Sequence, residues 1–136
     1  MCTQITTLAR SNDFRYILQC EHKTIHLSWD LVTLYLNLSE FERLVGLLEQ
    51  GTRLVKPTKL TESRCMVIYR EQGFYQVWVR NVGVNLTPVD FRIFLDMARS
   101  ALKVAHDNQA QWAPRELMKA FRQTDNAWAG SPFSIN

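Results

Sequence analysis

The stretch FRYILQCEHKTIHLSWDLVTLYLNLSEFERLVGLL, residues 14–48, decides the fold, because a degenerate copy of it follows at residues 63–98. The matches between the two copies are Arg15 with Arg64, Trp29 with Trp78, Phe41 with Phe91 and, after a one-residue shift, 36–39 with 84–87. A self-similar pattern of this kind predicts an internal duplication, with pseudo-repeats at residues 14–51 and 63–106.

Residues 14–29 predict a β-hairpin, since apolar and polar side chains alternate with a period of two. A two-residue turn at His22-Lys23 places Cys20 opposite Ile25. One face is then wholly apolar and consists of Tyr16, Leu18, Cys20, Ile25, Leu27 and Trp29. The other face carries Arg15, Ile17, Gln19, His26 and Ser28. One polar and one apolar face are typical of an antiparallel sheet packed on one side.

A third strand at 32–38 and a helix complete the first unit. Ser39 and Glu42 predict a capping box at the start of this helix, and Gly51 is expected to end it. The second unit repeats the order, and Thr87 and Asp90 predict a second capping box. Its strands are apolar on both faces, which predicts that the C-terminal segment or another subunit covers them.

The expected fold class is α+β, with duplicated strand-strand-strand-helix units in one antiparallel sheet or partly open barrel carrying two long helices. Residues 1–13 are expected to form a loose arm or edge strand, and residues 51–62 a polar connection. A C-terminal helix at 114–122 and an extended tail follow within 107–136. A length of 136 residues and a hydrophobic content of 46% predict a single domain, 1–136.

The composition narrows the function classes. The net charge of +3 is modest, and three cysteines form an odd, sparse set that favours a reducing, cytoplasmic location. No apolar run is long enough to cross a membrane, so no membrane insertion is expected. There is no Gly-x-Ser-x-Gly motif, no phosphate-binding loop and no convincing catalytic base, so no enzymatic activity and no cofactor are predicted.

Cys20, His22 and His26 form the one constellation that suggests chemistry, because thiolate and imidazole are zinc ligands. The hairpin register above turns His26 away from Cys20. The sequence therefore predicts a buried structural Cys20 and no metal site.

Met1-Cys2, Gln19-Cys20 and Ile25-His26-Leu27 carry a resemblance. The chain resembles a group of small uncharacterised bacterial proteins that open with Met-Cys and carry Gln-Cys-x-x-Cys-x-x-Ile-His-Leu. Lys23 stands where that pattern has its second cysteine. The resemblance covers about forty residues and implies no activity.

The leading functional hypothesis is a non-catalytic adaptor or regulatory protein that binds a protein partner and forms a homodimer. Its expected contact residues are Phe121, Trp128, Phe133 and Ile135 of the C-terminal segment, with Tyr75 and Val77 of the second sheet. The alternative is a nucleic-acid-binding module that uses the basic residues Arg53, Lys56, Lys59, Arg64 and Arg70.

Overall fold

The structure is a computed structural model that describes residues 2–123, with side chains described for residues 2–108. The chain divides into two compact units, residues 1–102 and residues 103–136. The first unit contains the strands of the described chain, helix α1 and the start of helix α2. The single-domain assignment stays a prediction.

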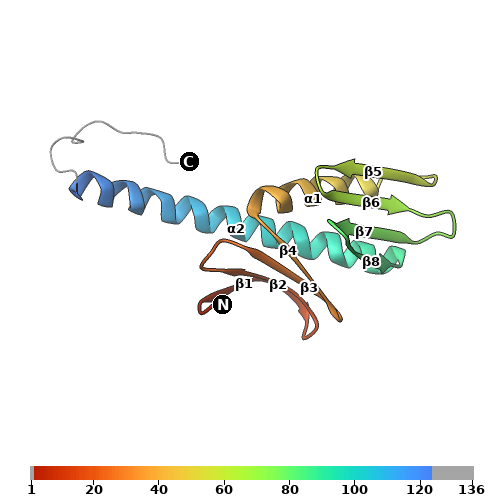
Figure 1. The fold of residues 1–136 in the computed structure, drawn as a ribbon, viewed down its shortest axis with the longest axis horizontal. Coiled ribbons are helices and arrows are strands. Elements are labelled where there is room, and N and C mark those ends of the chain that lie inside the picture. Colours follow the sequence, from red (N-terminus) through yellow and green to blue (C-terminus); the bar gives the residue numbers. More distant parts are fainter. Residues whose placement is uncertain (1, 124–136) are drawn as a thin grey trace. The chain divides into compact units, whose positions relative to one another are not determined.

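The first unit contains two four-stranded antiparallel sheets, each followed in the chain by a helix (Figure 1). The first half comprises β1 (Ile5–Asn12), β2 (Arg15–Cys20), β3 (Ile25–Trp29), β4 (Val32–Leu36) and α1 (Leu38–Gly51). The second half comprises β5 (Thr58–Glu62), β6 (Cys65–Tyr69), β7 (Tyr75–Val79), β8 (Val82–Leu86) and α2 (Pro88–Gln123). The α+β class is confirmed, but there are two open sheets where one was expected.

Each half begins with an edge strand: β1 is the edge strand that was one of the two alternatives for residues 1–13, whereas β5 was not predicted. β1 and β5 are edge strands, and Leu8 is the only buried residue of β1 while β5 has none. Without a buried face, neither strand shows the apolar alternation that marks a strand in a sequence. The segment expected as a polar connection, 51–62, therefore contains β5.

The two halves correspond at a constant spacing of fifty residues, as expected for an internal duplication. The equivalent turn bonds are Lys23 N–H to Cys20 C=O with Gly73 N–H to Arg70 C=O, and Asp30 N–H to Phe14 C=O with Arg80 N–H to Arg64 C=O. Positive φ angles recur at the same positions, Lys23 with Gly73 and Asp30 with Arg80. This spacing pairs Trp29 with Val79, so the expected match of Trp29 with Trp78 is wrong by one residue.

The register of the β2–β3 hairpin also differs from the prediction by one residue. Leu18 pairs with His26, because the turn holds three residues, 21–23, and Lys23 adopts a φ of 66°. A shift of one residue moves the side chains of β2 to the opposite face relative to those of β3. The inner face consequently carries Ile17, Ile25, Leu27 and Trp29. The outer face carries Tyr16, Leu18, Cys20, His26 and Ser28, of which Cys20 and Ser28 are also buried.

The caps explain where the helices begin. Asn37, not Ser39, caps α1: its side chain accepts from the Glu40 N–H at 2.7 Å, and Glu40 accepts from the Asn37 N–H at 3.0 Å. The expected box at Ser39 is wrong because the chain is already helical at Leu38. In α2 the predicted cap is present, since the Asp90 N–H donates to the Thr87 hydroxyl at 3.1 Å.

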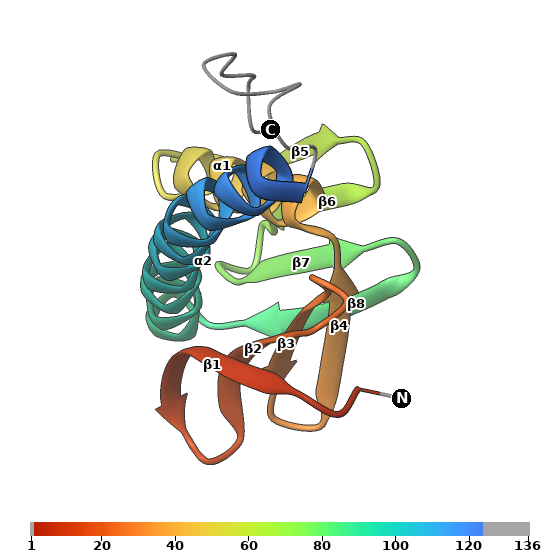
Figure 2. The same ribbon diagram turned by 90° about the vertical axis from the view of Figure 1, so that its left-hand side faces the viewer.

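Each helix contacts the other half of the first unit. α1 packs on β5 and β6 (Figures 1 and 2), and a Cβ at Gly51, its last residue, would lie 2.8 Å from the Phe91 ring. Gly51 is thus required for close packing and does not end the helix through a left-handed conformation. The Phe94 ring of α2 lies 5.1 Å from that of Trp29 on β3. These contacts join the two sheets through one apolar core.

Two ion pairs connect the halves, and in each of them an acid of one half binds an arginine of the other half. Arg80 of the second half bonds Glu40 of α1 at 2.7 Å, and Arg15 of the first half bonds Asp90 of α2 at 3.2 Å. Glu40 and Asp90 are equivalent residues in the first turns of their helices. Each acid therefore lies at a helix N-terminus, where negative charge is favourable.

The second sheet has one buried and one partly exposed face. Cys65, Val67, Tyr75, Val77 and Val79 are buried, and Met66, Ile68, Gln76 and Trp78 are half-buried on the outer face. Trp78 pairs with Met66 and therefore lies on the outer face.

Helix α2 continues through 107–109, where the sequence predicted a turn, and it includes the separate helix expected at 114–122. None of the helices among the described residues is long and apolar enough to cross a membrane. The tail residues Trp128, Phe133 and Ile135 lie outside the described residues.

Candidate metal centre

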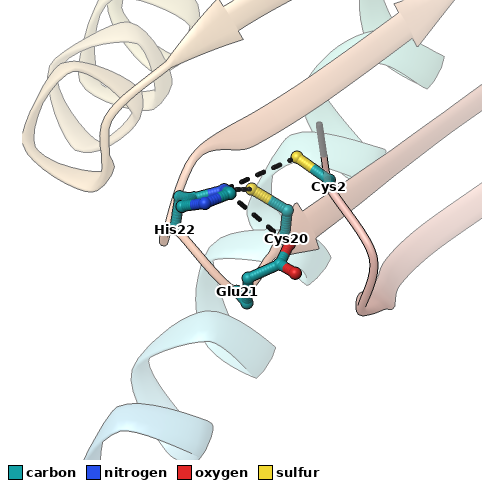
Figure 3. A group of neighbouring side chains, drawn as sticks. All are labelled: Cys2, Cys20, Glu21 and His22. Atoms are coloured by element: carbon teal, nitrogen blue, oxygen red, sulfur yellow. Dashed lines mark hydrogen bonds and ion pairs between the residues drawn. The ribbon is translucent and has the colours of Figure 1, made fainter.

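Four side chains from four segments gather at the end of the β2–β3 hairpin. Cys20 is the last residue of β2, His22 lies in the turn, and His26 lies on β3. The register that pairs Leu18 with His26 puts Cys20 and His26 on the same outer face of the sheet. Cys2 reaches this face from the arm that precedes β1 (Figure 3). The geometric argument against a shared metal is therefore wrong.

Hydrogen bonds of the turn hold the backbone of Cys20 in place. The Cys20 N–H donates to the Thr24 carbonyl at 3.2 Å, and the Lys23 N–H donates to the Cys20 carbonyl at 2.9 Å. Lys23 takes a left-handed conformation that costs a non-glycine residue some free energy. The equivalent residue of the other half is Gly73, which adopts it without that cost.

Glu21 fastens the N-terminal arm to the turn. Its carboxylate accepts the Thr3 N–H at 2.9 Å, the Thr3 hydroxyl at 2.5 Å and the Gln4 N–H at 3.1 Å. Hydrogen bonds from the Thr3 hydroxyl and from the backbone lower the pKa of Glu21 to about 2. These donors make Glu21 a clamp that positions the arm carrying Cys2. Its Oε1 also lies 3.7 Å from His22 Nδ1, and its carboxylate belongs with Cys2, Cys20 and His22 to a group whose potential ligand atoms lie within 4.8 Å of one another.

The sulfur–nitrogen distances are close to those of a tetrahedral site. Cys2 Sγ lies 3.8 Å from His22 Nδ1 and 3.8 Å from His26 Nε2, and Cys20 Sγ lies 3.7 Å from His22 Nδ1. With Zn–S bonds of about 2.3 Å and Zn–N bonds of about 2.0 Å, tetrahedral angles put sulfur and nitrogen about 3.6 Å apart. Figure 3 shows the His22 ring directed at both sulfurs.

The electrostatics of the cluster favour a thiolate at Cys20. Burial is the largest single influence and would raise the pKa of Cys20 on its own. Hydrogen bonds from Cys2, from His26 and from the backbone of Thr24 and His22 outweigh it and lower this pKa to about 5. The hydrogen bond to Cys20 raises the pKa of Cys2. At neutral pH the pair thus holds one thiolate and one thiol, and the thiolate is the metal-binding form.

His26 is oriented by its neighbour on β4. Its ring meets the ring of Tyr35 edge-on, with centroids 5.0 Å apart. This contact leaves Nε2 directed at Cys2. Such outer contacts fix the orientation of metal-binding histidines.

The same positions of the second half carry different chemistry. Arg70, Gln76 and Asn85 replace Cys20, His26 and Tyr35, and they form a hydrogen-bonded row: Arg70 Nε to Gln76 at 2.8 Å and Gln76 to Asn85 at 2.9 Å. The row contains no thiol and no imidazole. Within the described residues, the group of potential metal ligands belongs to the first half alone.

The other predicted sites are not gathered into a cluster. Tyr75 and Val77 are buried, and the Tyr75 ring stacks on Phe91 with centroids 3.9 Å apart, so these two residues offer no contact surface. The side chain of Phe121 and the tail residues lie outside the description. The five basic residues are exposed and spread over the connection, β5 and the ends of β6: Arg53, Lys56, Lys59, Arg64 and Arg70.

Cys2 is the site residue that sequence reasoning did not assign. The available signal was the Cys2 of the Met-Cys opening of the chain. Comparison with known proteins finds no matching family model, no matching curated protein and no matching solved structure. The interpretation of this site therefore depends on its own geometry.

Proposed function

We propose that the protein binds one Zn²⁺ ion through Cys2, Cys20, His22 and His26, and that the ion ties the N-terminal arm to the β2–β3 hairpin. The observation that carries this proposal is the set of three sulfur–nitrogen distances of 3.7 to 3.8 Å, which join Cys2 to His22, Cys2 to His26 and Cys20 to His22. Two thiolates and two imidazoles suit Zn²⁺, whereas Mg²⁺ and Ca²⁺ prefer oxygen ligands.

The role that follows is structural. A site with four protein ligands leaves no open position for substrate, which is typical of zinc ions that stabilise a fold. Residues 2–4 lie outside β1, and the described bonds that hold them run to the β2–β3 turn. Zinc adds a second fastening between the same two segments.

A zinc titration of the reduced full-length chain tests this function. Competition with a chromophoric chelator should give one ion per chain and nanomolar or tighter affinity. Co²⁺ in place of Zn²⁺ should give the intense visible bands of tetrahedral cobalt–thiolate. The control is Cys65→Ser, which removes a thiol of the second half and should bind equally well. No binding, or loss of binding in Cys65→Ser, would refute the site.

A second candidate function is binding of single-stranded nucleic acid on the outer face of the second sheet. The observation that favours it is Trp78, whose ring lies over Gly83: a Cβ at Gly83 would lie 2.6 Å from that ring. Lys59 and Arg70 are exposed beside this face. An aromatic ring with flanking cations is the usual means of stacking bases and neutralising phosphates.

A mobility shift at low and high salt tests the second candidate. Binding should fall steeply with salt and weaken in Lys59→Glu and in Trp78→Ala. The matched control is Lys23→Glu, which makes the same charge change in the first half. No shift at low salt would remove this candidate.

The adaptor hypothesis stays a prediction, as do the homodimer, the cytoplasmic location and the absence of enzymatic activity. Of its six expected contact residues, two are buried and the side chains of the other four are outside the described part of the chain.

A further inference from the structure

Cys2 and Cys20 form a thiol pair whose properties go beyond holding an ion. Their sulfur atoms lie within 4.8 Å of each other and belong to segments far apart in the sequence. Cys20 is anchored at the end of β2, while Cys2 precedes the residues that Glu21 clamps. A disulfide needs the sulfurs about 2.05 Å apart, so one of them must move. Cys2 lies outside the strands and is the one that can move.

We propose that a hydroperoxide converts this pair into an intramolecular Cys2–Cys20 disulfide and thereby releases the metal ion. The metal release depends on the zinc-binding function proposed above. The disulfide itself depends only on the placement of the two sulfurs.

The chemistry needs no group beyond the peroxide. In the zinc-loaded chain both ligand sulfurs are thiolates, and Cys2 is the more exposed of the two. Its sulfur attacks one peroxide oxygen, the O–O bond breaks, and Cys2 becomes a sulfenic acid while hydroxide or alkoxide leaves. The Cys20 thiolate then attacks the Cys2 sulfur, forms the S–S bond and displaces hydroxide. The two sulfurs lose two electrons, which the peroxide gains, and two protons convert the departing oxygens into water or water and alcohol.

Loss of the ion follows from the charge change. Both thiolates supply negative charge to Zn²⁺, and a disulfide supplies none, so only two imidazoles remain as ligands. Oxidation thus exchanges a metal cross-link between the arm and the hairpin for a covalent one.

The third cysteine provides an internal control. Cys65 is 1% exposed, donates its thiol hydrogen to the Glu40 carbonyl at 3.9 Å, and has its pKa raised by burial. It belongs to the second half, on the inner face of β6. It should stay reduced when the other two thiols react.

The experiment treats the zinc-loaded, reduced full chain with hydrogen peroxide while a chromophoric chelator reports free Zn²⁺. Peptide mapping after alkylation then locates the disulfide. The expected result is loss of the whole zinc content, with one disulfide between Cys2 and Cys20 per ion released and Cys65 fully alkylated. Dithiothreitol with added Zn²⁺ should restore the starting state.

Two results would overturn the inference. One is zinc loss accompanied by sulfinic or sulfonic acids without the Cys2–Cys20 disulfide. The other is retention of zinc after Cys65 has become oxidised. A chain that takes up no zinc refutes the proposed function instead; the same mapping on that metal-free chain then decides whether the disulfide forms. Cys65→Ser should leave the peroxide response unchanged, and a lost response would also overturn the inference.

Discussion

The two halves of the first unit share one topology and differ at one place on it. Both have four antiparallel strands and a helix whose capped first turn holds an acid paired to an arginine of the other half. On the outer face the first half presents Cys20, His26 and Tyr35, whereas the second presents Arg70, Gln76 and Asn85. The backbone therefore does not determine the site. The site is determined by the arm that carries Cys2 and by the identities of Cys20, His26 and Tyr35.

The largest effect on zinc affinity should come from removing one metal ligand, with a substitution at the equivalent position of the second half as the control. Cys20→Ser removes a thiolate, and we expect zinc affinity to fall more than about 100-fold, since even outer contacts of a metal site are worth about 10- to 100-fold. Arg70→Ala changes the matching position of the second half and should leave the affinity unchanged. Competition titration measures both variants. Equal affinities in the two variants would mean that the halves do not differ as described.

The two ion pairs between the halves, Arg80–Glu40 and Arg15–Asp90, should differ in strength. Glu40 is 7% exposed and accepts bonds from Arg80 and from the Asn37 N–H, while Asp90 is half-buried and shares Arg15 with Asp30. We expect Glu40→Ala to lower the free energy of unfolding by about 2 kcal/mol and Asp90→Ala by about 1 kcal/mol.

Urea unfolding of the two variants checks this order. The equivalent positions in the two helices make each variant the control for the other. A larger loss in Asp90→Ala would show that burial does not decide the strength of these pairs.

These comparisons also show which features the sequence could predict. Phe41 and Phe91, the helices and the α+β class follow from periodicity, because buried helix faces dominate the pattern. The site could not be predicted, because it depends on one residue of hairpin register. The alternation favours a two-residue turn at His22-Lys23, which makes one face wholly apolar, whereas the observed three-residue turn unites Cys20 with His26. Because lysine seldom adopts a positive φ, Lys23 does not predict that turn, whereas Gly73 at the equivalent position of the other half does.

For a related reason, β5 was not predicted and β1 was expected only as a loose arm or edge strand. Each is an edge strand that exposes most of its side chains. Cys2, placed by bonds from Thr3 and Gln4 to Glu21, depends on a contact between segments eighteen residues apart, which no local pattern encodes.

The clamp that places Cys2 should have a moderate effect. Glu21→Gln keeps the shape of the side chain but weakens its acceptance of the Thr3 and Gln4 N–H groups. We expect about a 10-fold loss of zinc affinity, as for other outer contacts of a metal site. Glu71→Gln, the equivalent change in the second half, should have none. An unchanged affinity in Glu21→Gln would show that zinc alone positions the arm.

A further effect concerns pH in the metal-free protein. The pKa of Cys20 is about 5 in the fold and 9.0 as its ordinary value, so folding favours the thiolate. A lowered pKa contributes stability that is fully present above the ordinary value and is lost as the pH falls through about 5. Stability should therefore rise between about pH 5 and pH 9, and this part of the rise should be absent in Cys20→Ser. Denaturant unfolding across that window measures it, and an unchanged slope in the variant would contradict the assignment.

The central claim is that the first half holds a zinc ion on two sulfurs and two nitrogens. X-ray absorption at the zinc K-edge of the reduced full chain, loaded with one equivalent of Zn²⁺, tests it most directly. The account predicts a four-coordinate ion with two sulfurs at about 2.3 Å and two nitrogens at about 2.0 Å. A six-coordinate ion with oxygen and nitrogen ligands only, or one sulfur in place of two, would contradict it.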